Sequence, residues 1–308
     1  MNTPPLSFLR RSFSLHPADL LFPGLTLFLI LAARVGFGAK SPIVVALLVT
    51  GVVLAGLPHG SLDPLVARQV FGQDRGFTMI RFFFGYLLLA AATAAGWLAA
   101  PNVALSLFLI VSAFHFGSDW QGRGDGWGRA AYGFCVISIS TLNYTADVRQ
   151  IFSTLGATRS ENIVSGLRLL AGVAILLATL SLFRRTQRRL LDCMELAGIV
   201  LGGLALPPLV FFTCYFCLLH SPRHLLLTSQ HVGLRGPVQV VVAAAPIVVA
   251  TLGLAALLWL FLPAYDASSR VLQVVFIGLA ALTAPHMLLT ALSERKRLHL
   301  TRKTPTLA

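Results

Sequence analysis

Long apolar runs recur along the whole chain and are separated by short polar or basic stretches. An α-helix rises about 1.5 Å per residue, so about 20 apolar residues cross a hydrocarbon layer about 30 Å thick. The pattern therefore predicts an all-α fold, a polytopic integral membrane helical bundle with about ten transmembrane helices. The predicted spans are 20–38, 42–58, 80–100, 103–118, 130–146, 163–183, 190–206, 208–228, 238–262 and 271–292.

The pair Pro207-Pro208 decides between ten spans and nine. A tight turn there separates two spans, whereas a kink leaves one. Basic residues gather in the N-terminal tail, at 184–189 and in the C-terminal tail, and such clusters mark the cytoplasmic side of a membrane. Ten spans place all three clusters on that side, so we favour ten spans and a cytoplasmic N-terminus, with nine as the alternative.

Composition and charge agree with a membrane bundle. The chain of 308 residues is 56% apolar and 11% charged, against about 25% charged in soluble domains. Its net charge of +13 comes from basic residues at the ends of apolar runs, which favours anionic lipid and excludes nucleic acid as a partner. We expect one multi-spanning domain at 19–292 in the inner (plasma) membrane, between basic tails at 1–18 and 293–308.

Five of the eight histidines lie in or beside apolar spans, where an ionisable residue usually has a functional role. His16 and His299 are in the tails and His231 is in a polar loop, so we assign these three no role. The settings of the other five are GLPHGSLDP with His59, SAFHFGSDW with His115, LLHSPRHLL with His220 and His224, and TAPHMLL with His286.

The five intramembrane histidines share one depth. In the ten-span topology all of them lie roughly 18–26 Å along spans that run from outside to inside, so they are predicted to meet at one point. His220 and His224 are also stacked on one helical face, where two imidazoles can bind one metal ion. Pro222 between them predicts a kink in that helix.

Two aspartates follow histidines at the i+4 position. Asp63 follows His59, and Asp119 follows His115. A carboxylate one helical turn away can accept the second ring N–H of a metal-bound imidazole, so we expect each aspartate to orient the histidine that precedes it. The alternative is that both aspartates mark the ends of spans in loops.

A centre of neutral imidazoles, without cysteine or carboxylate ligands, fits iron, copper or zinc. Zinc hydrolysis needs a nearby carboxylate base, as in H-E-x-x-H, and this motif is not in the sequence. A metal buried in a bilayer is reached by lipophilic substrates and by O₂. Three alternatives stay open: a membrane di-iron hydroxylase or desaturase acting on lipids or carotenoids, a histidine-rich transporter, and a haem-binding membrane protein.

Taken together, the histidine settings resemble the Brp/Blh family of bacterial and archaeal membrane β-carotene 15,15′-dioxygenases. The likeness runs from about 50 to 292. Its motifs are Gly-Leu-Pro-His-Gly-Ser-Leu-Asp-Pro at 56–64, His-Phe-Gly-Ser-Asp at 115–119, His-Ser-Pro-Arg-His at 220–224 and Pro-His-Met at 285–287.

The resemblance implies a non-haem Fe(II) enzyme that cleaves the central 15,15′ double bond of β-carotene with O₂ and gives two molecules of all-trans retinal. It also implies that retinal is handed to a rhodopsin. His286 matches a further family position and is expected to be catalytic, either as a fifth ligand or as a support for the others. The iron ligands implied are His59, His115, His220 and His224.

Overall fold

A computed structural model of the chain describes residues 22–24, 26, 42–72, 76–120, 126–184, 189–262 and 266–303. The expected N-terminal tail and nearly all of the first expected span lie outside these residues. Within the described residues every regular element is a helix, which confirms the all-α fold.

The helices follow one another with few residues between them. Two short segments, η2 and η5, are π-helical, and η3 and η4 are 3₁₀-helical. In chain order the elements are α2 (Pro42–Gly51), η2 (Val52–Gly56), α3 (Leu57–Gly60), α4 (Asp63–Phe71), α5 (Gly76–Ala99), α6 (Pro101–Gly117), η3 (Ser118–Trp120), α7 (Gly126–Ser138), η4 (Ile139–Thr141), α8 (Thr145–Thr154), α9 (Ser160–Phe183), α10 (Arg189–Ala205), α11 (Pro208–Cys214), η5 (Tyr215–His220), α12 (Ser221–His231), α13 (Pro237–Phe261) and α14 (Ala267–Lys303).

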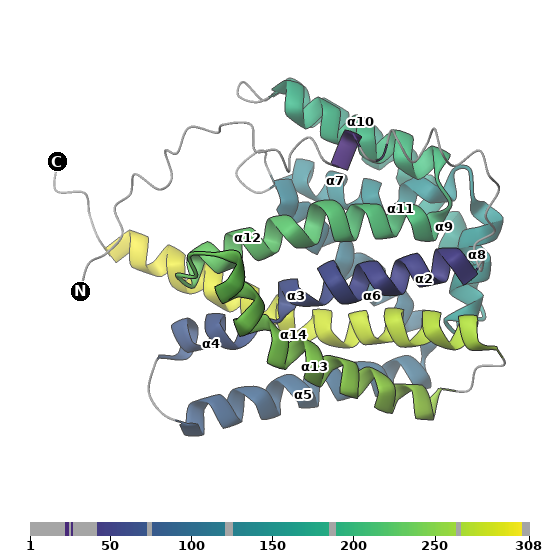
Figure 1. The fold of residues 1–308 in the computed structure, drawn as a ribbon. Coiled ribbons are helices and arrows are strands. Elements are labelled where there is room, and N and C mark those ends of the chain that lie inside the picture. Colours follow the sequence, from purple (N-terminus) through teal and green to yellow (C-terminus); the bar gives the residue numbers. More distant parts are fainter. Residues whose placement is uncertain are drawn as a thin grey trace.

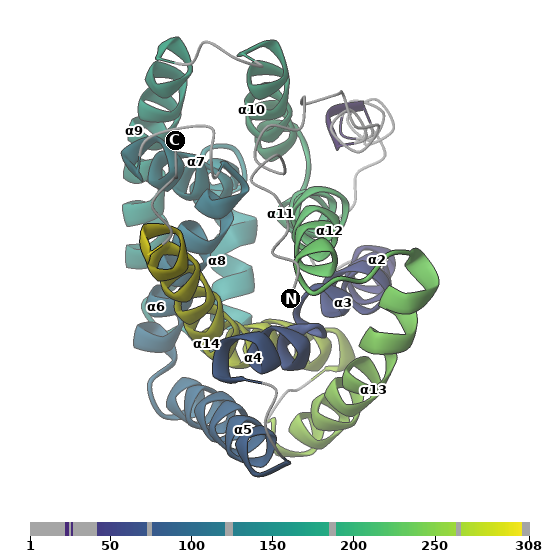
Figure 2. The ribbon, with the colours of Figure 1, turned by 90° about the vertical axis from the view of Figure 1, so that its left-hand side faces the viewer.

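The long helices lie side by side, and α14 runs through the middle of the bundle (Figure 1). It packs against α5, α4, α2 and α13. Seen along the helices, α6, α7 and α9 form one side of the molecule, and α11, α12 and α2 form another (Figure 2). Helix α14 continues to Lys303, so the helix extends into the segment expected to be a C-terminal tail.

Six helices within the described residues are long and apolar enough to cross a membrane. The expected run 190–206 forms α10, of 17 residues, and the run 130–146 is divided between α7, η4 and α8. The continuous helix 208–231 contains three histidines and an arginine, which lower its hydropathy. The count of ten spans therefore stays a prediction. The six helices are Pro42–Phe71, Thr78–Ala99, Pro101–Trp120, Ser160–Phe183, Pro237–Phe261 and Ala267–Lys296.

The pair Pro207-Pro208 is a turn and not a kink, as predicted for ten spans. Helix α10 ends at Ala205, and α11 begins at Pro208, where a proline without an N–H is tolerated in the first helical turn. The turn is held by two hydrogen bonds from another segment, since Asn143 Nδ2 donates to the Leu204 carbonyl and the Tyr144 hydroxyl to the Ala205 carbonyl, both at 2.9 Å.

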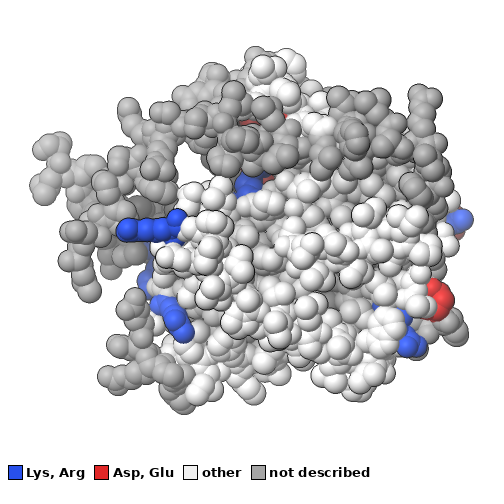
Figure 3. Space-filling model, in the orientation of Figure 1, with Lys and Arg blue, Asp and Glu red and all other residues white. Residues whose placement is uncertain are grey.

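The outer surface is that of a membrane protein. Leucine, valine and phenylalanine side chains are exposed along α5, α9 and α13. On the face drawn in Figure 3, Lys and Arg side chains lie toward the ends of the helices, and most of the described surface between them is uncharged. Such a belt matches the hydrocarbon layer of a bilayer.

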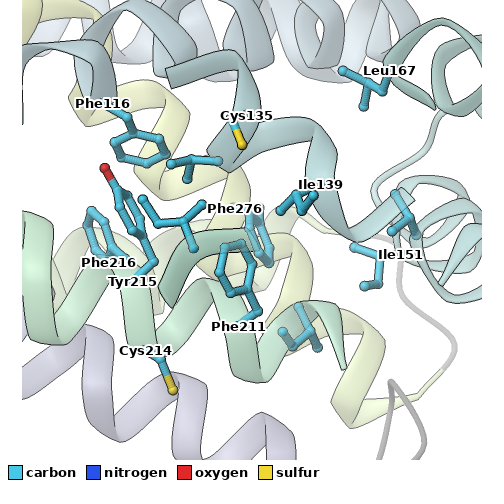
Figure 4. Close-up of a cluster of buried hydrophobic side chains, with 14 of the residues drawn as sticks. Phe116, Cys135, Ile139, Ile151, Leu167, Phe211, Cys214, Tyr215, Phe216 and Phe276 are labelled. Carbon is cyan, nitrogen blue, oxygen red and sulfur yellow. The ribbon is translucent and has the colours of Figure 1, made fainter. Parts of the chain in front are cut away.

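The core lies between α6, α7, α11, η5 and α14 (Figure 4). Phe116, Tyr215 and Phe216 pack there with ring centroids 5.1–6.5 Å apart. Helices α6 and α7 approach closely at Gly133, where a Cβ atom would collide with the Ala113 carbonyl. Close backbone contact through a small residue is a common device for packing membrane helices.

Candidate metal centre

His59 is positioned by a local break in helix geometry. The chain passes from α2 through the π-helical turn η2 into α3, whose first turn contains Pro58. Wide π-helical turns are rare and often occur at functional sites. Nδ1 of His59 donates to the Gly56 carbonyl, one turn earlier. The neutral ring therefore carries its lone pair on Nε2.

His220 and His224 lie on a second helix with the same feature. The π-helical segment η5 ends at His220, and Pro222 lies in the first turn of α12. The helix therefore departs from α-helical geometry immediately before Pro222, and the kink expected at Pro222 itself stays a prediction. The hydroxyl of Ser221, the first residue of α12, donates to the Ala55 carbonyl in η2, which ties the start of α12 to the first π-helical segment.

The remaining two histidines come from α6 and α14. His115 lies near the end of α6, and the chain then tightens into the 3₁₀-helix η3, where the Ser118 hydroxyl donates to the His115 carbonyl at 2.6 Å. His286 lies in the interior of α14, immediately after Pro285. Both imidazoles are buried.

The five histidines converge, as their common depth predicted. Ring centroids lie 4.6 Å apart for His115 and His220, 5.0 Å for His224 and His286, and 5.4 Å for His59 and His286. One nitrogen from each of His59, His115 and His286 can be chosen so that all three lie within 4.8 Å of one another. His286 thus lies close enough to His59 and His115 to share a metal ion with them, although the resemblance left its role open.

His231, expected to have no role, lies exposed at the end of α12, where its backbone carbonyl accepts a hydrogen bond from Gln69 Nε2 at 3.1 Å. His16 and the side chain of His299 fall outside the part of the chain that is described.

The two aspartates bind histidines, but not the histidines that precede them. Nδ1 of His286 donates to the Asp63 carboxylate at 2.9 Å, and Nδ1 of His220 donates to the Asp119 carboxylate at 3.0 Å. The expected partners were His59 and His115, so that pairing is wrong. In both places the α-helix ends between histidine and aspartate, which removes the i+4 geometry.

Each carboxylate also accepts a hydrogen bond from a tyrosine. The hydroxyl of Tyr86 on α5 donates to Asp63 Oδ2 at 2.9 Å, and that of Tyr215 on η5 donates to Asp119 Oδ2 at 2.6 Å. The centre is therefore flanked by two Tyr–Asp–His hydrogen-bonded series. The first joins α5, α4 and α14, and the second joins η5 and η3. Neither tyrosine was singled out from the sequence, because nothing in its local pattern distinguishes it from a packing residue.

A buried ion pair joins α10 to the same centre. The two terminal guanidinium nitrogens of Arg223, Nη2 and Nη1, donate to the Glu195 carboxylate at 2.8 and 3.1 Å. Nη1 of Arg223 also lies 3.4 Å from the Asp119 carbonyl oxygen, and the Tyr132 hydroxyl donates to Glu195 at 2.8 Å. Glu195, an acidic residue within the expected span 190–206, is thus a buried partner of the histidine-bearing helix.

The residues present fit a divalent metal ion. Nε2 of His286 is buried without a hydrogen-bond partner, and Nε2 of His220 lies 3.1 Å from Nε2 of His115. Two nitrogens bound at right angles to one ion, each about 2.1 Å from it, are about 3 Å apart. Asp63 and Asp119 together contribute two negative charges, which a divalent cation would neutralise in this buried setting.

A cavity of about 350 Å³ adjoins the histidines. Its wall contains His59, His115 and His286 and, apart from a few hydroxyl groups and Asp63, is formed by apolar side chains of α3, α4, α5, α6, α11, η5, α13 and α14. A mainly apolar pocket with a few convergent polar groups is the usual form of a small-molecule site. The arrangement suits chemistry at a metal ion on an apolar substrate.

Known proteins resemble this chain over most of its length. Residues 50–293 match the family described as Beta-carotene 15,15'-dioxygenase. The chain is 32% identical over 248 residues to Beta-carotene 15,15'-dioxygenase of Uncultured marine bacterium 66A03, which covers 77% of this chain and 90% of that protein. It is 27% identical over 295 residues to Probable beta-carotene 15,15'-dioxygenase Blh of Halobacterium salinarum, and this match covers 80% of this chain and 84% of that protein. No solved structure matches.

Proposed function

Because the chain belongs to the beta-carotene 15,15'-dioxygenase family, we propose that it cleaves the central 15,15′ double bond of β-carotene with O₂ and releases two molecules of all-trans retinal. Each carbon of the cleaved bond takes one oxygen atom of O₂, so the reaction needs no further reductant. The observation that carries the proposal is the convergence of five histidines from four stretches of helix beside an apolar cavity.

We further propose that the cofactor is one Fe(II) ion, held by His59, His115, His220 and His224, with His286 as a fifth ligand. His286 is assigned as a ligand because one of its ring nitrogens lies within 4.8 Å of a ring nitrogen of His59 and of His115. When bound, the ferrous ion supplies a site for O₂ activation, and neutral imidazoles are suitable ligands for it.

The protein contributes orientation and a dry environment. Asp63 and Asp119 accept the Nδ1–H groups of His286 and His220, so the Nε2 lone pairs of both rings face the centre. Phe116 and Phe216 form part of the cavity wall beside the histidines. This wall excludes water and holds a flat polyene by apolar contact.

The remaining parts of the proposal concern location and partners. The chain lies in the inner (plasma) membrane with its N-terminus in the cytoplasm, as the distribution of basic residues favours. Residues 19–292 are the single catalytic domain between the tails 1–18 and 293–308. The retinal formed is handed to a rhodopsin.

The deciding experiment is expression of the full chain in a bacterium that accumulates β-carotene. We expect the orange colour to fade and all-trans retinal to appear on chromatography, with one iron atom per purified chain. Chelation should abolish cleavage, and Fe(II) should restore it.

Other outcomes separate the alternatives. Two iron atoms per chain together with a hydroxylated or desaturated product would favour the di-iron class. A Soret absorption band would favour haem. Flux of a solute into liposomes without any product would favour a transporter.

A further inference from the structure

The cavity beside the histidines is open on one side. The residues that line it from α6, η5 and α14 are all buried or half-buried. The exposed lining side chains come from two helices, α5 and α13, and Phe83, Leu87 and Leu254 among them expose 40%, 48% and 44% of their surface. The exposed set is Phe83, Leu87, Ala250 and Leu254.

Helices α5 and α13 lie at the edge of the molecule. Both pack against α14, while α5 also contacts α6 and α4, and α13 contacts α3. Figure 2 shows α5 and α13 on the same edge, with α14 and α4 on the inner side between them. The mouth of the cavity therefore lies between two peripheral membrane helices.

The mouth is at the depth of the hydrocarbon layer. At about 1.5 Å per residue, Phe83 and Leu87 lie roughly 8–14 Å from the Thr78 end of their span. Ala250 and Leu254 lie roughly 10–17 Å from the Phe261 end of theirs. None of the four side chains carries a polar atom, so the mouth suits an apolar molecule.

We propose that the gap between α5 and α13 is a lateral portal, through which the polyene moves from the bilayer to the histidine centre. This inference rests on the proposed function. The bond to be cleaved is at the middle of the molecule, so both halves must find room on either side of the centre. One half of the polyene lies in the cavity against the side chains of α6, η5 and α14, and the other half lies in the portal.

Ala250 has the smallest side chain of the portal, so a large side chain at this position should block the opening. Ala250→Trp in the full-length protein should lower kcat/KM for β-carotene at least tenfold while one iron per chain is retained. Leu254→Trp, one turn further along α13, should act in the same way. Cleavage of a carotenoid shortened at one end beyond the central bond should fall less, because its short half needs little of the portal.

The matched control is Val249→Trp. Val249 is adjacent to Ala250, is 68% exposed and does not line the cavity, so this variant should keep wild-type kcat/KM. A second readout is independent of turnover. When the wild type is purified without O₂ from β-carotene-accumulating cells, it should keep bound carotenoid, detected by its absorbance. The amount bound to Ala250→Trp should be at least tenfold lower.

The outcomes are distinguishable. If the wild type cleaves β-carotene and both portal variants match Val249→Trp, the portal is overturned and the proposed function stands. If iron is lost together with activity in both portal variants, the portal is also overturned, because the substitutions then act on the centre. If the iron-loaded wild type itself yields no retinal, the proposed function fails.

Discussion

Nδ1 of His286 donates a hydrogen bond to the carboxylate of Asp63, 2.9 Å away and 223 positions earlier in the chain. The bond joins α14 to α4 and sets the direction in which the buried imidazole faces. Since the Nε2 atom of the same ring has no hydrogen-bond partner, one side of His286 is fixed by the protein and the other is available to a ligand.

Removal of either histidine of the H-x-x-x-H pair should stop the reaction. His220→Ala or His224→Ala should reduce retinal formation in β-carotene-producing cells to background, because each removes one metal-binding nitrogen. Membrane fractions should still contain the protein. His231→Ala, on the exposed end of α12, should be silent, and normal retinal output from His220→Ala or His224→Ala would remove that residue from the metal site.

Neutralising either buried carboxylate should weaken metal binding. Asp63→Asn and Asp119→Asn keep the size of the side chain but remove the charge that holds an imidazole Nδ1–H, so metal affinity should fall about 10- to 100-fold. Competition with a chelator measures this directly. Asp147→Asn, in the first turn of α8, is the matched control, and unchanged affinity in both site variants would show that these carboxylates do not support the ligands.

The ion pair between Glu195 and Arg223 should be essential for stability. Glu195→Ala leaves the guanidinium of Arg223 without its main partner, and breaking a buried pair costs about 3–5 kcal/mol. The thermal unfolding midpoint in detergent should fall, whereas Glu161→Ala, on the exposed first turn of α9, should leave it unchanged. An equal midpoint for wild type and Glu195→Ala would mean that α10 docks by other contacts.

The close approach of α6 and α7 should tolerate no side chain at Gly133. In Gly133→Ala the added methyl group meets the backbone carbonyl of Ala113, which cannot rotate away. Overpacking of this kind costs about 1–3 kcal/mol, and the unfolding midpoint should drop accordingly. Gly253→Ala, on α13, has no atom within 4 Å of the new methyl group and should not lower the midpoint, because alanine is a better helix former than glycine.

The partners of the aspartates show where prediction from sequence reached its limit. The spacing of Asp63 from His59 suggested one helical face, but α3 ends at Gly60 and α4 begins at Asp63. A break of a few residues changes the direction in which the side chains of the following helix point, and the hydropathy of the sequence does not reveal this change. The sequence therefore predicted that a carboxylate would support a histidine, and it missed which one.

Glu195 illustrates a different limit. An acidic residue in an apolar run signals a buried partner, but the sequence offers several arginines as candidates. The choice of Arg223 depends on how α10 and α12 lie across each other. The same holds for Tyr86 and Tyr215, whose hydroxyl groups acquire a role only because Asp63 and Asp119 lie opposite them.

The sequence by itself determined a helical membrane protein with five histidines at one depth, because hydropathy and the rise per residue are properties of each segment alone. The turn at Pro207-Pro208 followed from the distribution of basic residues along the chain. Only the tertiary structure decided which histidine each aspartate holds, that His286 joins His59 and His115, and that the cavity opens between α5 and α13. These depend on the rotation and crossing of helices distant in sequence, which are set by packing between segments and not by any one of them.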